Sequence, residues 1–289
     1  MANQNRMVLT LYCPNRPGIV AAVSNFILHA GGDIVDANQF DDAESGNFFM
    51  RVVYSLASDS VSEEQHVKDF ELISRSFGMN FRIRRSNDLQ RVLILTSKFD
   101  HCLTDLLYRH RIGELPMALV GIVANHPKDN FSQCDIRDDV PFHYLPVTKE
   151  TKLEQEMALW SLIQESRAEL VILARYMQIL SDPLTAKLAG RCINIHHSFL
   201  PGFKGARPYH QAYARGVKLI GATAHYVTSD LDEGPIIEQD VERITHQDTP
   251  DILIRKGRDI ERRVLARAIA WHLDGRVIQN GKKTVVFRD

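Results

Sequence analysis

The stretch Arg191–Gly205 reads RCINIHHSFLPGFKG and joins a strand pattern to a loop that carries polar residues. Its first apolar residues predict a buried strand that ends near His196, and the proline and glycines beyond predict a loop. Side chains alternate along a strand, so Asn194 and His196 face one side and His197 faces the other. Sites in open parallel sheets form at the carboxyl ends of strands, which favours a functional site here. Polar residues that only satisfy backbone groups of a turn are the alternative.

Apolar runs and helical periodicities alternate on both sides of this stretch. The runs are typical of buried strands, and the segments between them repeat their apolar residues with a helical period. Alternating strands and helices indicate an α/β domain with a doubly wound, mostly parallel sheet. The expected strands are 92–95, 118–124, 170–174, 192–196, 220–227 and 236–241, and the expected helices are 100–111, 149–167, 183–188 and 250–273.

The first 84 residues show a different order of elements. A β-α-β-β-α-β pattern predicts an α+β ferredoxin-like domain. Its second helix is expected to start near Ser60, which has capping-box spacing to Glu63. A polar segment follows the last expected strand, as is common at a domain boundary. We therefore predict a first domain at 1–84, a linker at 85–90 and a second domain at 91–289.

The acidic turn Thr228–Pro235 reads TSDLDEGP and lies between two expected strands. Taken alone, such a loop is typical of a solvated turn. Together with Asn194 and His196, a carboxylate from this turn would complete a set suited to attack on a carbonyl carbon. The amide can donate to a developing oxyanion, the imidazole can move a proton, and the carboxylate can orient or deprotonate a water.

Composition and motif content disfavour several classes of function. The 289 residues include 35 Lys and Arg against 36 Asp and Glu, so a net charge of −1 gives no field for nucleic acid or an anionic membrane. The longest apolar run has eight residues, far short of the ~20 that span a bilayer. No secretory signal, nucleotide-binding glycine motif or metal-ligand spacing is found. We therefore expect no metal ion, and a cytoplasmic protein whose four cysteines are reduced.

Three motifs in a fixed order give the chain a resemblance to a known family. They are RYMQIL at Arg175–Leu180, NIHHSFLP at Asn194–Pro201 and DLDEGP at Asp230–Pro235. Together they resemble the formyltransferase-type fold that uses 10-formyltetrahydrofolate. Within that fold, the chain resembles the formyltetrahydrofolate deformylase family over essentially its whole length.

The resemblance to the deformylases implies roles for particular residues. Asn194, His196 and Asp232 would form the catalytic trio, and Asp230 is the neighbour that an alignment could confuse with Asp232. The folate would be the substrate, and no separate cofactor is expected. The residues implied to bind this substrate, mostly around its pteridine ring, are Arg175, Tyr176, Met177, Gln178, Ile179, Leu180 and His225.

The N-terminal segment at 11–34, LYCPNRPGIVAAVSNFILHAGGDI, is similar to an ACT domain, a module often regulated by small molecules such as amino acids. Free N–H groups at a helix start suit a carboxylate, and paired glycines allow a ligand to approach the chain closely. We therefore predict an amino-acid effector and a homo-oligomer formed through this domain, with a purely structural dimerisation domain as the alternative. The predicted effector residues are Asn15, Arg16, Pro17, Gly18, Ile19, Gly31, Gly32, Asp33 and Ile34.

Departures from the related transferases favour water as the acceptor of the formyl group. The loop Thr96–His101 has no glycine and carries an acid, which disfavours a phosphorylated acceptor. Only 57 residues follow Asp232, so we expect no C-terminal barrel of the kind that methionyl-tRNA formyltransferases carry. We predict hydrolysis of 10-formyltetrahydrofolate to tetrahydrofolate and formate. The alternatives are a formyltransferase that uses an amine acceptor and a catalytically inactive folate or amino-acid sensor.

Overall fold

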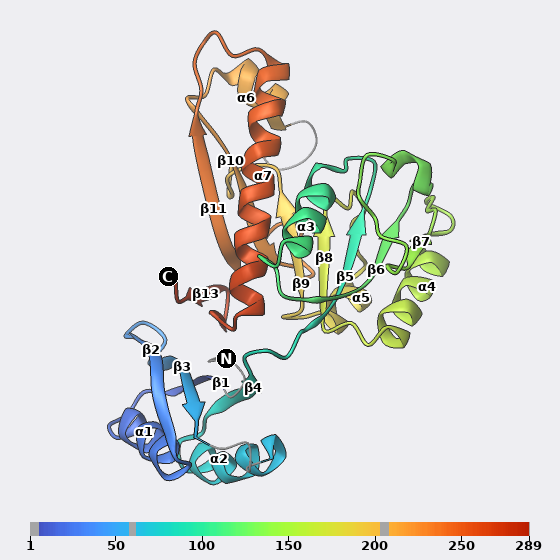
Figure 1. Ribbon diagram of the computed structural model, residues 1–289. Helices are drawn as coiled ribbons and strands as arrows, with labels where there is room; N and C mark the ends of the chain where they lie inside the picture. The colour runs from blue at the N-terminus through green and yellow to red at the C-terminus, as the bar shows by residue number, and fades with distance from the viewer. Residues whose placement is uncertain (1–5, 58–61, 203–207, 289) are drawn as a thin grey trace. The chain divides into compact units, whose positions relative to one another are not determined.

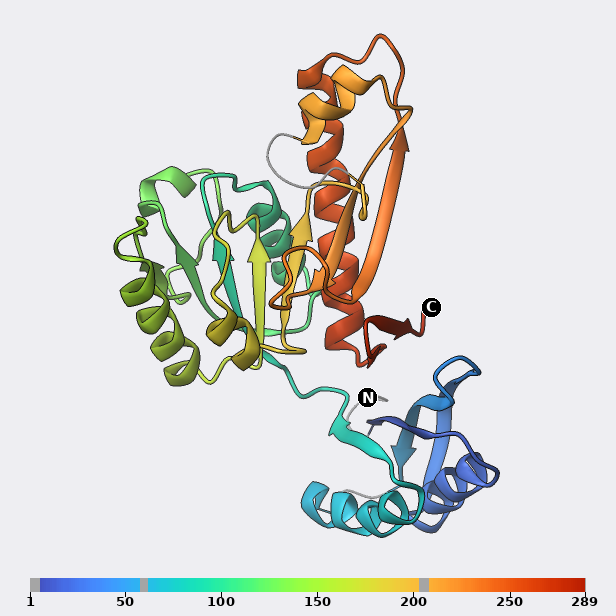
Figure 2. The same cartoon turned by 180° about the vertical axis from the view of Figure 1, so that it is seen from behind.

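The chain folds into two compact units. The computed structural model describes residues 6–57, 62–202 and 208–288, so Ser60 and Gly205 lie outside the described residues. One unit consists of Met1–Asp88 together with Asp274–Asp289, and the other of Leu89–Leu273. Figure 1 and Figure 2 show the elements of each unit from opposite sides.

The first unit has the predicted β-α-β-β-α-β order. Its strands form an antiparallel sheet of order β2-β3-β1-β4, which is the ferredoxin-like arrangement. Both helices lie on one face of this sheet (Figure 1), where side chains such as Leu9, Val23 and Phe70 form a buried core. The elements are β1 (Arg6–Pro14), α1 (Ile19–His29), β2 (Gly32–Asp42), β3 (Asn47–Leu56), α2 (Glu63–Phe77) and β4 (Asn80–Arg85).

Helix α2 is capped by a residue other than the one the sequence pattern indicated. Ser62 has extended backbone geometry, and its side chain accepts a hydrogen bond from the backbone N–H of Gln65 at 3.2 Å. This contact satisfies one of the N–H groups that a helix start leaves unpaired. Glu63 and Glu64 add negative charge to the first turn, where the helix dipole stabilises it.

The C-terminal hairpin belongs to the first unit, whereas the sequence analysis assigned it to the second domain. Strands β12 (Val277–Asn280) and β13 (Lys283–Val286) form this hairpin. Ile278 and Phe287 pack against Phe49, a buried residue of β3. The assignment to 91–289 therefore extends too far, because the hairpin buries its apolar side chains on the ferredoxin-like sheet.

Arg51 ties this C-terminal segment to the sheet. Its side chain is only 2% exposed and forms ion pairs of 2.8 Å with both Asp36 and Asp274. It also donates two hydrogen bonds of 3.2 Å to the backbone carbonyl of Asp274. These contacts satisfy a guanidinium that would otherwise be costly to bury.

Replacing Arg51 with methionine should lower the free energy of unfolding of this unit by about 1–3 kcal/mol. The aliphatic volume is largely kept, whereas the contacts to Asp36 and Asp274 are lost. Amide hydrogen exchange should then show faster exchange in β12 and β13. The matched control is Arg75→Met, because Arg75 is 75% exposed and pairs with Glu71 of its own helix. Equal destabilisation by the two substitutions would contradict this role of Arg51.

The second unit contains a seven-stranded, mostly parallel sheet of order β11-β10-β9-β8-β5-β6-β7. The strands from β7 to β9 in this order are parallel, and β10 and β11 are antiparallel additions at one edge. After β5 the chain adds β6 and β7 on one side, and from β8 onward it adds strands on the other side of β5. Open sheets bind ligands at such a switch point, which lies here between β5 and β8. The strands are β5 (Arg91–Thr96), β6 (Ala118–Ala124), β7 (Phe142–Tyr144), β8 (Leu170–Ala174), β9 (Cys192–His196), β10 (Leu219–Tyr226) and β11 (Ile236–Arg243).

Helices cover both faces of this sheet, as a doubly wound fold requires. Figures 1 and 2 show α3 and α7 on one face and α4 and α5 on the other. None of the helices within the described ranges is long and apolar enough to cross a membrane. The helical segments are α3 (His101–Arg111), η1 (Lys128–Phe131), α4 (Lys152–Glu165), α5 (Asp182–Lys187), α6 (Pro208–Arg215) and α7 (Pro250–Leu273).

Candidate active site

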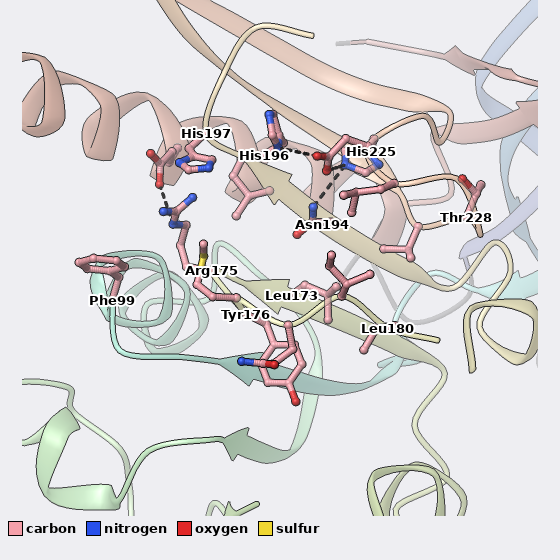
Figure 3. A pocket seen from close by; sticks show the side chains of 18 of the residues that line it. Phe99, Leu173, Arg175, Tyr176, Leu180, Asn194, His196, His197, His225 and Thr228 are labelled. Carbon is pink, nitrogen blue, oxygen red and sulfur yellow. Dashed lines mark hydrogen bonds and ion pairs between the residues drawn. The ribbon is translucent and has the colours of Figure 1, made fainter. Parts of the chain in front are cut away.

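A cavity of about 590 Å³ lies at the carboxyl ends of the central strands of the second unit. Figure 3 shows side chains of β9, of β10 and of the segment after β8 pointing into it. The cavity brings together all the residues that the sequence analysis assigned to catalysis or substrate binding. These are Arg175, Tyr176, Met177, Gln178, Ile179, Leu180, Asn194, His196, His225 and Asp232.

Strand β9 places two of the polar side chains side by side. Asn194 pairs with His225 across the antiparallel ladder to β10, and His196 pairs with Thr223. Asn194 and His196 are two residues apart on one strand, so both project from the same face of the sheet. His196 is only 5% exposed.

Asp232 reaches the imidazole of His196 from the loop between β10 and β11. Its Oδ2 lies 3.2 Å from Nδ1 of His196. Burial raises the pKa of Asp232, but contacts with His196 and His225 outweigh burial and hold the pKa below its usual range. Asp232 is therefore a carboxylate at neutral pH, aimed at an imidazole. The nearby Asp230 is exposed and makes no such contact among the described residues.

A tight loop geometry fixes the position of Asp232. Its backbone φ is 57°, a left-handed value that few residues other than glycine adopt. The loop is closed by a hydrogen bond of 2.9 Å from Tyr226 N–H to the carbonyl of Pro235. A Cβ at Gly234 would overlap the carbonyl oxygen of Tyr226, so only glycine fits at this closure.

His225 orients the amide of Asn194. Nδ1 of His225 lies 2.9 Å from the carbonyl oxygen of Tyr226, so this nitrogen carries the proton and donates it. Nε2 of that ring lies 3.7 Å from Oδ1 of Asp232. It also lies within hydrogen-bond distance, 3.3 Å, of the amide nitrogen of Asn194. This contact uses one N–H of Asn194 and leaves the second N–H for a ligand. The sequence analysis assigned His225 to substrate binding, and the structure adds this contact within the protein.

The second imidazole nitrogen of His196 is the free polar group at the centre of the site. Within the described part of the chain, Nε2 is buried and has no hydrogen-bond partner. A buried polar atom without a partner is costly in a folded protein and points to a ligand. The amide of Asn194 and Nε2 of His196 are thus two groups available to a polar atom bound in the cavity.

A second polar cluster in the cavity wall surrounds Glu261 of α7. Its carboxylate accepts hydrogen bonds from the Tyr209 hydroxyl at 2.6 Å and from Nε2 of His101 at 2.8 Å. Nε of Arg175 forms an ion pair with it at 3.3 Å. Burial raises the pKa of Glu261, but these partners overcome burial and lower the pKa to about 2. Glu261 therefore stays charged although its side chain is 1% exposed.

His197 lies in the same cavity, contrary to the side that strand alternation predicts. Strand β9 ends at His196, so the alternation does not extend to His197. Its ring contacts the rings of His196 and Tyr209, with centroid distances of 5.2 and 6.3 Å. Burial, assisted by the charge of Arg175, lowers the pKa of His197 to about 3. The ring is therefore neutral at physiological pH.

One group among the described residues has donor atoms close enough to hold a metal ion, namely His101, Cys102 and Glu261. Burial holds the pKa of the Cys102 thiol well above its usual range, so the sulfur keeps its proton. His101 and Glu261 bond to each other, and Glu261 also bonds to Tyr209. The group therefore forms a hydrogen-bonded cluster in this structure.

The two predicted effector segments lie at opposite ends of α1 in the first unit. Asn15 bonds to Gly46 next to the β2–β3 turn, whereas Gly32 pairs with Leu56 at the far end of β3. These ends of the ten-residue strand β3 are ~30 Å apart. Arg16 bonds to the carbonyl of Ser76 at the end of α2. The segments 15–19 and 31–34 therefore do not form one site within a single chain.

Comparison with known proteins identifies the family. The formyl transferase family model matches residues 90–269. A formyltetrahydrofolate deformylase of Corynebacterium sp. (strain P-1) is 48% identical over 290 residues, which is 100% of both chains. The chain belongs to the formyltetrahydrofolate deformylase family.

Solved structures separate this deformylase family from the transferases. The crystal structure of a formyltetrahydrofolate deformylase from Burkholderia mallei is 49% identical, with a TM-score of 0.92, and the match covers 98% of this chain and 100% of that one. A glycinamide ribonucleotide transformylase from Symbiobacterium toebii is 27% identical with a TM-score of 0.62. That match covers 95% of the transformylase but only 69% of this chain. The chain is thus similar to deformylases over its whole length and to the transformylase over part of it.

Proposed function

We propose that this enzyme hydrolyses 10-formyltetrahydrofolate to tetrahydrofolate and formate, and that Asn194, His196 and Asp232 are its catalytic residues. Membership of the deformylase family supports the reaction. The observation that carries the assignment of residues is the contact of 3.2 Å between Asp232 and Nδ1 of His196. Among the residues that the structure describes, it leaves Nε2 of the same ring without a partner in the cavity, beside the second N–H of Asn194.

The proposed attack uses Asp232 as the base and the other two residues as donors. Water adds to the formyl carbon and forms the new C–O bond, while Asp232 accepts one water proton. The oxygen of the tetrahedral intermediate accepts hydrogen bonds from Asn194 and from Nε2 of protonated His196. Oδ2 of Asp232, 3.2 Å from Nδ1, holds the ring in position for this donation.

Collapse of the intermediate breaks the bond between the formyl carbon and N10. His196 gives its Nε2 proton to N10, and the products are tetrahydrofolate and formic acid, which ionises to formate. Asp232 then passes its proton to His196, which returns both side chains to their starting forms. All protons are supplied by water and by the trio, so we propose that the folate is a consumed substrate and that no separate cofactor takes part.

Oxygen isotope incorporation tests this reaction. The full-length protein is incubated with 10-formyltetrahydrofolate in water enriched in oxygen-18, and formate is analysed by mass spectrometry. We expect each formate to carry one oxygen from the solvent, together with one tetrahydrofolate per formate. Formate without solvent oxygen would contradict direct attack by water, and absence of formate would contradict hydrolysis.

The segment Arg175–Leu180 is proposed to bind the pteridine ring. It follows β8 at the carboxyl edge of the sheet, and its residues line the cavity. Tyr176 and Leu180 are buried, and the backbone N–H of Met177 is held by Ser97 at 2.9 Å. A fixed backbone beside an apolar wall suits a flat, polar-edged ring.

Gly234 provides a test of the loop that positions Asp232. Gly234→Ala should force this loop away from Tyr226, because the added Cβ would overlap a backbone oxygen. A displacement of about 1 Å at a catalytic group typically costs about 10²-fold in rate. We therefore expect kcat for formate release to fall by about 10- to 100-fold while the folate KM changes little. An unchanged kcat in steady-state assays would show that the closure does not position Asp232.

We further propose that the N-terminal unit is an ACT domain that binds an amino acid and mediates homo-oligomer formation. The start of α1 offers backbone N–H groups for a carboxylate. A site that used both predicted segments would need two chains, since the segments lie at opposite ends of α1. The four cysteines are free and buried, which suits the reducing cytoplasm as the proposed location.

Titration of the full-length protein with each of the twenty amino acids tests this regulatory proposal. A coupling typical of allosteric enzymes would change the affinity for the folate by about 5- to 150-fold. Light scattering by the full-length protein should show an oligomer. A monomer whose activity is indifferent to every amino acid would contradict the proposal and leave the proposed hydrolysis unaffected.

A further inference from the structure

Tyr226, the last residue of β10, forms a hydrogen bond with helix α7 that the proposed hydrolysis does not use. The preceding residue, His225, lines the cavity, so strand alternation directs the Tyr226 side chain to the other face of the sheet. Helix α7 packs against β10, and Figures 1 and 2 show the two elements side by side. The buried Tyr226 hydroxyl lies 2.7 Å from Nδ1 of His272, in the last turn of α7. The two rings meet edge to face, with their centroids 5.8 Å apart.

The backbone of Tyr226 anchors the loop that carries Asp232. Its N–H donates to the carbonyl of Pro235 at 2.9 Å, which closes the loop. Its carbonyl oxygen accepts a hydrogen bond of 2.9 Å from Nδ1 of His225, whose Nε2 lies 3.7 Å from Asp232. The same oxygen is the atom that a Cβ at Gly234 would overlap. A shift of Tyr226 would therefore move the loop and the His225 ring together.

The hydrogen bond to His272 gives the end of β10 a directional restraint. Packing of an aromatic ring tolerates small shifts, whereas a hydrogen bond requires a set distance and angle. His272 belongs to a 24-residue helix with fully buried side chains such as Val264 and Ile269. The contact therefore ties the residue that anchors the Asp232 loop to a long and well-packed helix.

We propose that Tyr226 and His272 are positioning residues for the catalytic carboxylate. The hydrogen bond between their side chains holds the end of β10, and through it Asp232, in the geometry that attack by water requires. This inference rests on the proposed hydrolysis and deepens it. Because the contact acts on the position of the base, its loss slows the chemical step and leaves folate binding nearly unchanged.

Two substitutions in the full-length protein remove the contact from either side. Tyr226→Phe keeps the ring and loses the hydroxyl, and His272→Phe keeps a ring and loses the nitrogen. In steady-state assays of formate release we expect each to lower kcat by about tenfold, with little change in the folate KM. The double variant should lose no more than either single one, because all three lack the same contact. His272→Asn, whose amide can replace Nδ1, should keep most of the rate.

Amide hydrogen exchange tests the support of the loop without an activity assay. The amides of residues 228–235 should exchange faster in Tyr226→Phe and in His272→Phe than in the unaltered protein. A second test uses Gly234→Ala, in which the loop is already displaced. There Tyr226→Phe should add little to the loss of kcat, whereas two independent effects would multiply.

Tyr54→Phe is the matched control. The Tyr54 hydroxyl is also buried beside an imidazole, 2.6 Å from Nε2 of His66, but it lies in the first unit, which holds none of the proposed catalytic residues. This substitution should lower the melting temperature and leave kcat unchanged.

The outcomes separate this proposal from the hydrolysis on which it rests. Unchanged kcat and unchanged loop exchange in Tyr226→Phe and His272→Phe would overturn the positioning role. An equal loss of kcat in Tyr54→Phe would also overturn it, because the loss would then follow from lower stability. Absence of formate from the unaltered protein would instead overturn the proposed hydrolysis, and loop exchange would still decide whether the contact holds the loop.

Discussion

Replacing Asp232 with asparagine is expected to lower kcat for formate release by about 10³- to 10⁴-fold. The amide keeps the shape of the side chain but cannot accept the proton of the attacking water. It also removes the charged partner of the His196 ring, whose Nδ1 lies 3.2 Å from Oδ2. Steady-state assays of formate release measure the loss, and equilibrium binding of tetrahydrofolate should change far less.

Asp230→Asn is the matched control for this substitution. Asp230 lies two residues away in the same loop, and it is exposed where Asp232 is largely buried. The control should therefore keep a rate close to that of the unaltered protein. A severe loss with Asp230→Asn and a mild one with Asp232→Asn would show that the other carboxylate is the base.

Asn194→Ala is expected to lower kcat by about 10²- to 10³-fold and to change the folate KM little. The substitution removes the donor that His225 orients toward the cavity through a contact of 3.3 Å. Because an oxyanion exists only after attack, a lost donor to it slows the chemical step more than it weakens binding. Separate determination of kcat and KM measures this difference. A loss expressed wholly in KM would show that Asn194 only positions the substrate.

Local sequence patterns predict the centre of the site because its geometry depends on short-range rules. The apolar run that ends at His196 indicates a strand, and the two-residue period places Asn194 beside His196. The structure has this arrangement at the carboxyl edge of a mostly parallel sheet. The deformylase resemblance added Asp232, which spacing alone does not distinguish from Asp230.

The Glu261 cluster depends on contacts between distant segments, and the sequence analysis missed it. His101, Arg175, Tyr209 and Glu261 come from four separate parts of the chain. One signal was present, since Glu261 lies among buried residues of the 24-residue helix α7. A charged residue on the buried face of a helix requires a partner, but the sequence does not show which side chain supplies it.

The sequence did not show which domain the C-terminal hairpin belongs to, and the reason is similar. Residues 277–286 form two short strands, but strand propensity in a sequence carries no information about which sheet the strands cover. The contact of Ile278 and Phe287 with Phe49 joins segments more than 220 residues apart in the chain. The ion pair between Arg51 and Asp274 spans a similar separation. Such long-range packing is visible only in the folded protein.

Formate release by the purified full-length protein, measured with and without added primary amine, tests the central claim most directly. We predict one formate per 10-formyltetrahydrofolate consumed, at a rate that saturates with the folate and is unchanged by glycinamide. Folate turnover that requires the amine, with formylglycinamide as the product, would contradict it.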